Sequence, residues 1–178
     1  MVKGLPGLRK TGLVRELRRA FAGACERGDF RLVEYSIQDN HLHLIVEAES
    51  QQALSRGMMA ISVRLAQTVN RVFKRTGRVV AGRYPLRLLK TPSEVRDALC
   101  YVLLNIRKHF VQRHDKAPPV QVDEASSGGQ FDGWRPSPET LRIKAASQEE
   151  LGVAKPLGWL LRIGWRKRGL IDLASIPG

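Results

Sequence analysis

The chain has 178 residues, enough for one domain with a sizeable core and a smaller appendage. Its apolar content of 43% fits a folded globular protein; it contains no apolar run of membrane-spanning length, and its first residues lack the apolar stretch of a secretory signal. The net charge is +13, and most of it lies in residues 1–113, which hold 21 Lys and Arg against 9 Asp and Glu. Residues 114–178 hold 9 against 8. This charge favours a polyanionic partner, although solubility alone is a second explanation.

Two cysteines, Cys25 and Cys100, lie among apolar residues of helical type. We expect buried thiols in a reducing compartment rather than a disulfide, and therefore a cytoplasmic protein. The lack of a long apolar run predicts no membrane partner.

The first elements are a helix and a pair of strands. Apolar residues at spacings of three and four predict a helix over 9–27, ended by Gly28. Residues 30–37 and 41–48 predict two strands joined by a turn at Asp39-Asn40. In the second strand, two sets of side chains point to opposite faces: Leu42, Leu44 and Val46 on one, and His41, His43, Ile45 and Glu47 on the other.

The longest predicted helix covers 51–75. Opposite its apolar stripe lies a basic face, made of Arg56, Arg64, Arg71, Lys74 and Arg75. Such a face is either a solvated surface or a surface that follows DNA phosphates. In the second interpretation, Arg83 and Arg87 also contact the DNA. Residues 78–90 predict a strand interrupted near Gly82 and Pro85, and Thr91-Pro92 opens a helix that runs to about residue 112.

The rest of the chain has a different composition. Proline, serine and glycine in 114–137 predict a linker, and shorter helices follow near 138–151 and 156–168. We therefore expect an α+β fold in which an antiparallel sheet has helices packed on one face. The predicted division is a domain over 1–113, a linker over 114–137 and a small helical extension over 138–178.

Two groups of residues suggest chemistry. His41 and His43 are two positions apart on a strand, so their imidazoles project from one face and can bind one metal ion, although two solvent-facing polar residues are the commoner explanation. Tyr101 lies away from the apolar stripe of its helix, with Asn105 one turn later. An interfacial tyrosine is one explanation, and a nucleophile beside a third metal ligand is the other.

The second explanation is chemically coherent. A phenol, with a pKa near ~10, attacks phosphodiesters poorly unless a divalent cation polarises the phosphate. Attack by a tyrosine leaves a covalent phosphotyrosine, which conserves the bond energy for a later joining step. Imidazole and amide ligands alone do not identify the metal.

The segment NHLHLIVEA, residues 40–48, resembles the histidine–hydrophobe–histidine (HUH) motif of single-tyrosine transposases. Residues 77–109 resemble the downstream block of the REP-associated tyrosine transposases, in which the catalytic tyrosine opens a Y-[IV]-x-x-N segment. The resemblance implies a ferredoxin-like antiparallel core, Tyr101 as nucleophile, and a Mg²⁺ or Mn²⁺ site made by His41, His43 and Asn105. It also implies a single-stranded DNA substrate with imperfect hairpins, a 5′-phosphotyrosine intermediate, and a monomer or homodimer. Glu47 is either a group supporting the metal site or a polar residue of the sheet.

Two departures from the family pattern stand out. Relatives usually have a strand just before the G-L-P-x-L-R segment, which here follows Met1 within a few residues, so we expect a gap or an open edge in the sheet. Tyr84-Pro85 also stands where this branch commonly has Tyr-His. Besides strand cleavage, two other functions stay open: a non-catalytic protein that binds single-stranded DNA or RNA, and a decayed transposase that only binds DNA.

Overall fold

The computed structural model describes residues 1–2, 4–24, 26–116, 118–146 and 152–177. It is an α+β fold, which confirms the predicted class, with a sheet in the order β1-β2-β3 and antiparallel pairing throughout. Its elements are α1 (Thr11–Ala22), β1 (Glu26–Arg27), β2 (Phe30–Ile37), β3 (Leu42–Ala48), α2 (Gln51–Val72), α3 (Pro92–His114), η1 (Ser127–Gly129), α4 (Pro138–Ala146), α5 (Trp159–Arg162) and η2 (Gly164–Arg168).

Helix α1 is shorter than predicted. It ends at Ala22 with Gly23 as its C-cap, and residues 26–27, which were expected to be helical, form β1 instead. The reason is long-range: Glu26 and Arg27 pair with Arg31 and Phe30 across a tight turn that holds Gly28. The prediction of a buried thiol at Cys25 lies outside the described residues, whereas Cys100 is a half-buried free thiol whose pKa is raised by burial.

Strands β2 and β3 form the predicted hairpin around Asp39-Asn40. Ile37 pairs with Leu42 and Phe30 with Ala48, and the register shifts at a bulge between Leu32 and Glu34. The predicted alternation of β3 is confirmed, because its two sets of side chains enter different cores. Leu42, Leu44 and Val46 pack with α1 and α2, whereas Ile45 packs with α3.

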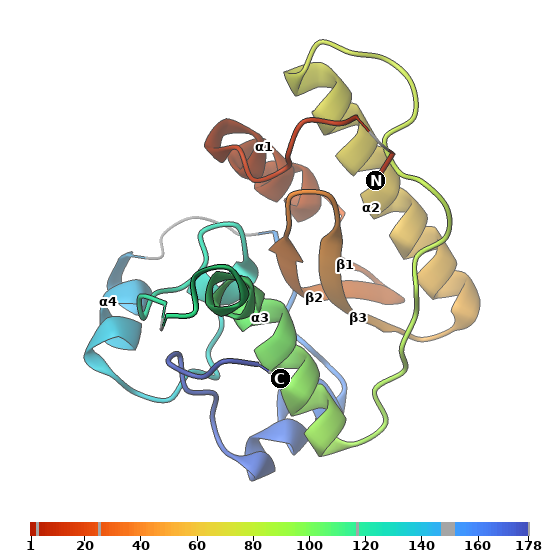
Figure 1. Cartoon of the computed structure of the whole chain (residues 1–178). Helices are drawn as coiled ribbons and strands as arrows, with labels where there is room; N and C mark the ends of the chain where they lie inside the picture. The colour runs from red at the N-terminus through yellow and green to blue at the C-terminus, as the bar shows by residue number, and fades with distance from the viewer. Residues whose placement is uncertain (3, 25, 117, 147–151, 178) are drawn as a thin grey trace.

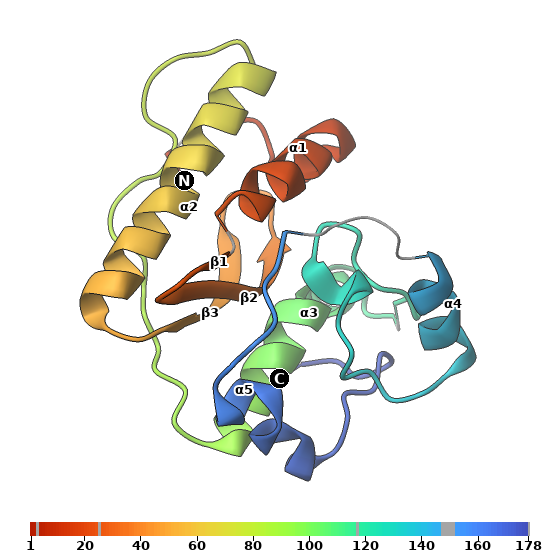
Figure 2. The same ribbon diagram turned by 180° about the vertical axis from the view of Figure 1, so that it is seen from behind.

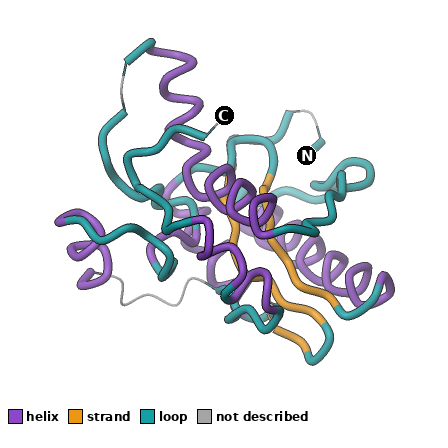
Figure 3. The backbone as a smooth tube through the Cα atoms, turned by 90° about the horizontal axis from the view of Figure 1, so that it is seen from below, coloured by secondary structure: helices purple, strands orange, loops and turns teal. Residues whose placement is uncertain are grey.

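The sheet therefore separates two layers of helices. Helices α1 and α2 lie toward the top of Figure 1, and α3 lies below the sheet beside the C-terminal segments. Figures 2 and 3 show the same arrangement from behind and from below. The prediction of helices on one face describes α1 and α2, and α3 adds a second layer on the opposite face.

Residues 78–90 do not form the predicted strand. They run extended past α2 without a strand partner in the described chain, and the backbone turns at Gly82, where φ is +67°. A strand is stable only when a neighbour accepts its backbone hydrogen bonds, and Pro85 removes one donor. The next element behaves as predicted, because Thr91 and Glu94 form a capping box at the start of α3, with Pro92 at its first position.

The segment 114–137, predicted as a linker, packs firmly where it follows α3. Ser126 bridges to Ser36 of β2, and Ile37 donates its backbone N–H to the carbonyl of Ala125 at 2.8 Å. Asp123 accepts two hydrogen bonds from Arg9, at 2.6 and 2.9 Å. This part of the segment therefore belongs to the folded body; the division of the chain into domains stays a prediction.

The helical extension is also less regular than predicted. Residues 138–146 form α4, and the rest of the helix predicted over 138–151 lies outside the described residues. The helix expected over 156–168 is divided into α5 and η2, with Ile163 between them. Both pieces pack beside α3, and Trp165, 1% exposed, stacks on Phe131 at 5.6 Å between ring centroids.

Candidate active site

His41 and His43 lie side by side at the start of β3. Their Nε2 atoms are 3.0 Å apart and their ring centroids 4.6 Å apart. The Nδ1 atom of His41 lies 2.7 Å from the side-chain oxygen of Asn40, which orients the ring. The strand geometry thus brings together the two imidazoles that the sequence pattern indicates.

Tyr101 of α3 faces this pair. Its ring centroid is 5.1 Å from that of His43, and the side chain is 36% exposed. The core residues of α3, including Val102 and Leu99, fix the helix against the sheet and leave Tyr101 at its edge. Three of the four predicted central residues therefore meet at one place.

Asn105 lies one turn after Tyr101 and is 1% exposed. Neither its side-chain oxygen nor its side-chain nitrogen has a hydrogen-bond partner within the described part of the chain. A buried amide without partners costs free energy, on the order of 1–3 kcal/mol, so it fits a site that a ligand completes.

The two histidines are held in the neutral form. Burial lowers the pKa of His43 to about 4, with further contributions from His41 and His109. Burial also lowers the pKa of His41, and the charges of His109 and the chain's amino terminus add to the effect. A neutral imidazole has the free lone pair that a metal requires.

The geometry of the pair fits a divalent ion. Two ligands about 2.1 Å from one ion and about 90° apart are separated by about 3.0 Å, the spacing of the two Nε2 atoms. No third histidine, cysteine, aspartate or glutamate joins the pair in a metal-binding group, as far as the structure describes the chain. Asn105, the third ligand that the resemblance implies, has a side-chain oxygen without a hydrogen-bond partner among the described residues.

Two residues near the site were missed by the sequence reasoning. The ammonium of Lys108 lies 5.4 Å from the centre of the Tyr101 ring, and His109 is close enough to lower the pKa of both histidines. Both follow Tyr101 at seven and eight positions, which places them on the same side of α3. This spacing could have indicated from the sequence that both residues lie near Tyr101.

The predicted DNA-binding residues are dispersed. On α2, Arg56 pairs with Asp29, and Arg71 pairs with Glu16 at 3.0 Å. Arg75 bonds the side chain of Asn70 at 2.8 Å, while Arg64 and Lys74 are exposed. Arg83 and Arg87 are exposed on the extended segment, and Arg87 lies 3.9 Å from Glu94.

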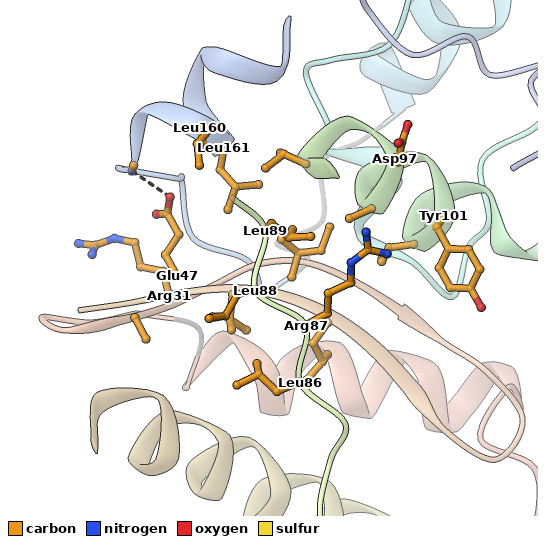
Figure 4. Close-up of a pocket in the computed structure, with 18 of the residues that line it drawn as sticks. Arg31, Glu47, Leu86, Arg87, Leu88, Leu89, Asp97, Tyr101, Leu160 and Leu161 are labelled. Carbon is orange, nitrogen blue, oxygen red and sulfur yellow. Dashed lines mark hydrogen bonds between the residues drawn. The ribbon is translucent and has the colours of Figure 1, made fainter. Parts of the chain in front are cut away.

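Glu47 is hydrogen-bonded to the C-terminal extension. Its carboxylate accepts the backbone N–H groups of Leu157 and Gly158, at 2.7 and 2.9 Å, and so attaches the C-terminal extension to β3 (Figure 4). These residues border an open cleft of about 1680 Å³. The edge of β3 that does not pair with β2 forms one wall, residues 85–89 and α3 form the others, and Tyr101 lies at one end. Among the described residues, no strand pairs with this edge of β3.

Residues 8–84 match the model of a family described as IS200-like transposases. The matched region covers less than half of the chain; it includes the histidine pair and ends before Tyr101 and Asn105. No curated protein and no solved structure matches the chain. None of the described helices is both long enough and apolar enough to span a membrane. The match therefore shows a likeness to this family over the region that carries the histidine strand and its surrounding elements.

Proposed function

We propose that the protein is a metal-dependent nuclease that cuts and rejoins single-stranded DNA through Tyr101, as the REP-associated tyrosine transposases do. The observation that carries the proposal is the cluster of His41, His43 and Tyr101: the Nε2 atoms of the two histidines are 3.0 Å apart, and the ring of His43 lies against the ring of the tyrosine. The transposase match agrees with a DNA substrate.

In this mechanism, His41, His43 and Asn105 would hold Mg²⁺ or Mn²⁺. The ion, when bound, supplies Lewis acidity toward a phosphate oxygen. Tyr101 loses its proton to solvent, and its Oη attacks the phosphorus. The bond from phosphorus to the 3′-oxygen breaks, the 3′-oxygen takes up a proton, and the 5′-phosphate stays on the tyrosine. Rejoining reverses these steps with another 3′-hydroxyl.

Positive side chains assist the tyrosine. The ammonium of Lys108 lies over its ring at 5.4 Å from the centroid, where it can attract the scissile phosphate. Arg87 extends from the 85–89 segment toward α3 in Figure 4 and provides a second cation at the same end of the cleft.

The test is covalent capture of DNA. A pool of single-stranded hairpins with randomised flanks, labelled on either side of the hairpin, is incubated with protein and Mn²⁺ and separated under denaturing conditions. Wild type is expected to retain the label attached to the 5′-phosphate side, and Tyr101→Phe to retain none. Tyr84→Phe is the matched control, because Tyr84 is similarly exposed, at 44%.

The metal site has its own control. His43→Ala is expected to abolish both Mn²⁺ binding and the adduct, whereas His114→Ala, at an exposed histidine near the end of α3, keeps both. A wild-type protein that binds hairpins and never forms an adduct would instead be a DNA-binding protein without cleavage activity.

A further inference from the structure

The C-terminal extension carries a strongly basic stretch that its overall charge conceals. Residues 155–169 contain five basic residues and no acid: Lys155, Arg162, Arg166, Lys167 and Arg168. Only Arg166 has an acidic partner in the described structure, Asp132 at 2.5 Å. Arg162, Lys167 and Arg168 are exposed, so α5 and η2 present unneutralised positive charge to solvent.

An exposed tryptophan lies within this charge. Trp159 is 51% exposed, whereas Trp134 and Trp165 are 3% and 1% exposed. Its ring rests on the backbone at Gly164, where a Cβ atom would come within 2.7 Å of the indole. A ring supported in this way keeps its orientation while much of its surface stays open.

The ring also has a cation above it. The ammonium of Lys167 lies 5.2 Å from the centre of the Trp159 ring, and no acid competes for it among the residues that the structure describes. A nucleotide offers both groups a better partner: the base stacks on the indole, and the displaced ammonium pairs with the phosphate.

The position of Trp159 relates it to the proposed nucleophile. Both Trp159 and Tyr101 border the same cleft, with Leu160 and Leu161 at one end of Figure 4 and Tyr101 at the other. The cleft walls hold both signs of charge: Arg31, Arg87 and Arg96 against Asp29, Glu47, Glu49 and Asp97. The uncompensated positive charge lies at the rim, on α5 and η2.

We propose that Trp159, Arg162, Lys167 and Arg168 form a second binding surface for single-stranded DNA, which stacks one unpaired base on the indole and pairs the neighbouring phosphates with the three cations. The surface rests on the proposed function only for the identity of its ligand. An anionic membrane is a poorer match, because α5 has four residues and cannot form an amphipathic helix that lies along a lipid surface.

Fluorescence anisotropy with labelled oligo-dT of about 20 nucleotides tests this surface. Trp159→Ala is expected to weaken binding roughly tenfold, and Trp159→Phe to keep most of the affinity, since one stacked base accounts for an effect of this size. Lys167→Ala and Arg168→Ala are each expected to lower the slope of the logarithm of affinity against the logarithm of salt concentration by about one, the value of one phosphate contact. The control is Leu141→Ala, which removes an apolar side chain, 64% exposed, from α4.

The inference and the proposed function fail separately. Tyr101→Phe should bind oligo-dT as wild type does; if no adduct ever forms while Trp159→Ala still weakens binding, the nuclease proposal falls and the surface stands. Oligo-dT binding by folded Trp159→Ala that equals wild type overturns the surface. The surface is also overturned if Trp159→Ala binds vesicles of phosphatidylcholine and phosphatidylserine more weakly than wild type but binds DNA equally well.

Discussion

Glu34 offers a quantitative test of how β2 packs against the segment that follows α3 and contains Ser127. This carboxyl group lies on β2 beside the bulge, 7% exposed, next to the hydroxyl of Ser127, which also accepts the backbone N–H of Tyr35 at 2.8 Å. Burial raises the pKa of Glu34 from 4.5 to about 8; the hydrogen bond from Ser127 opposes this effect, and the charge of Asp132 adds to it. The carboxyl group is therefore protonated in the folded protein at neutral pH.

The direction in which stability changes with pH follows from the number of protons that the folded and unfolded chains bind. Between pH 4.5 and about 8 the unfolded chain has lost this proton while the folded chain keeps it, so stability falls as the pH rises. At about 1.4 kcal/mol for each pH unit, wild type should lose about 2.5 kcal/mol between pH 5 and pH 7 through this group alone. Glu34→Gln keeps a hydrogen-bonding group of the same shape and has no proton to lose.

Urea unfolding at pH 5, 6 and 7 measures the difference. The stability of Glu34→Gln relative to wild type should rise steadily across this range, because all other titrating groups are common to both proteins. Glu49→Gln, at an exposed glutamate just after β3, is the control and should follow wild type. Parallel curves for Glu34→Gln and wild type would refute the burial of a neutral carboxyl group at this position.

Three further predictions concern the metal site and the helices. Because the pKa of His43 is lowered to about 4, at most one of the two ligands takes up a proton, and Mn²⁺ affinity measured by calorimetry should fall less than about tenfold between pH 7 and 5.5; an ordinary histidine pair would lose about 100-fold, and a loss of that size would contradict the lowered value. Gly57→Ala should destabilise the protein by about 1–3 kcal/mol in urea unfolding, because the new Cβ would lie 2.2 Å from the buried ring of Phe30. Gly12→Ala, where nothing lies within 4 Å, should instead stabilise α1 by about 0.5–1 kcal/mol, and equal effects at the two glycines would refute the packing argument. Thr91→Ala should cost about 1 kcal/mol by removing the capping box of α3, and Thr91→Ser should cost little; equal losses for both would exclude the hydroxyl as the cause.

The fold class and the proximity of the two imidazoles could both be predicted from the sequence, the second because it depends on a short spacing. Two residues on one strand share a face whatever surrounds them, so His41 and His43 could be paired from the sequence alone. Residues 78–90 show the limit: their β-type composition predicts a strand, but a strand also requires a partner, and none pairs with them in the described structure. Similarly, the serine and glycine residues of 126–129 indicate a linker, although long-range hydrogen bonds hold them against β2.

The position of Tyr101 depends on more than the helix that carries it. Helix α3 contacts β2 and β3 on one side and the C-terminal extension on the other, where Trp165 enters its core. Arg107, 4% exposed, donates hydrogen bonds to the carbonyls of Ser175 and Ala174 at 3.1 and 3.0 Å. The imidazoles lie on the sheet and the phenol on α3, so their separation is set by how firmly this helix is clamped. The extension thus holds in place the helix that carries the proposed nucleophile, although none of its described residues contacts Tyr101 in the ring and cation contacts of the cluster.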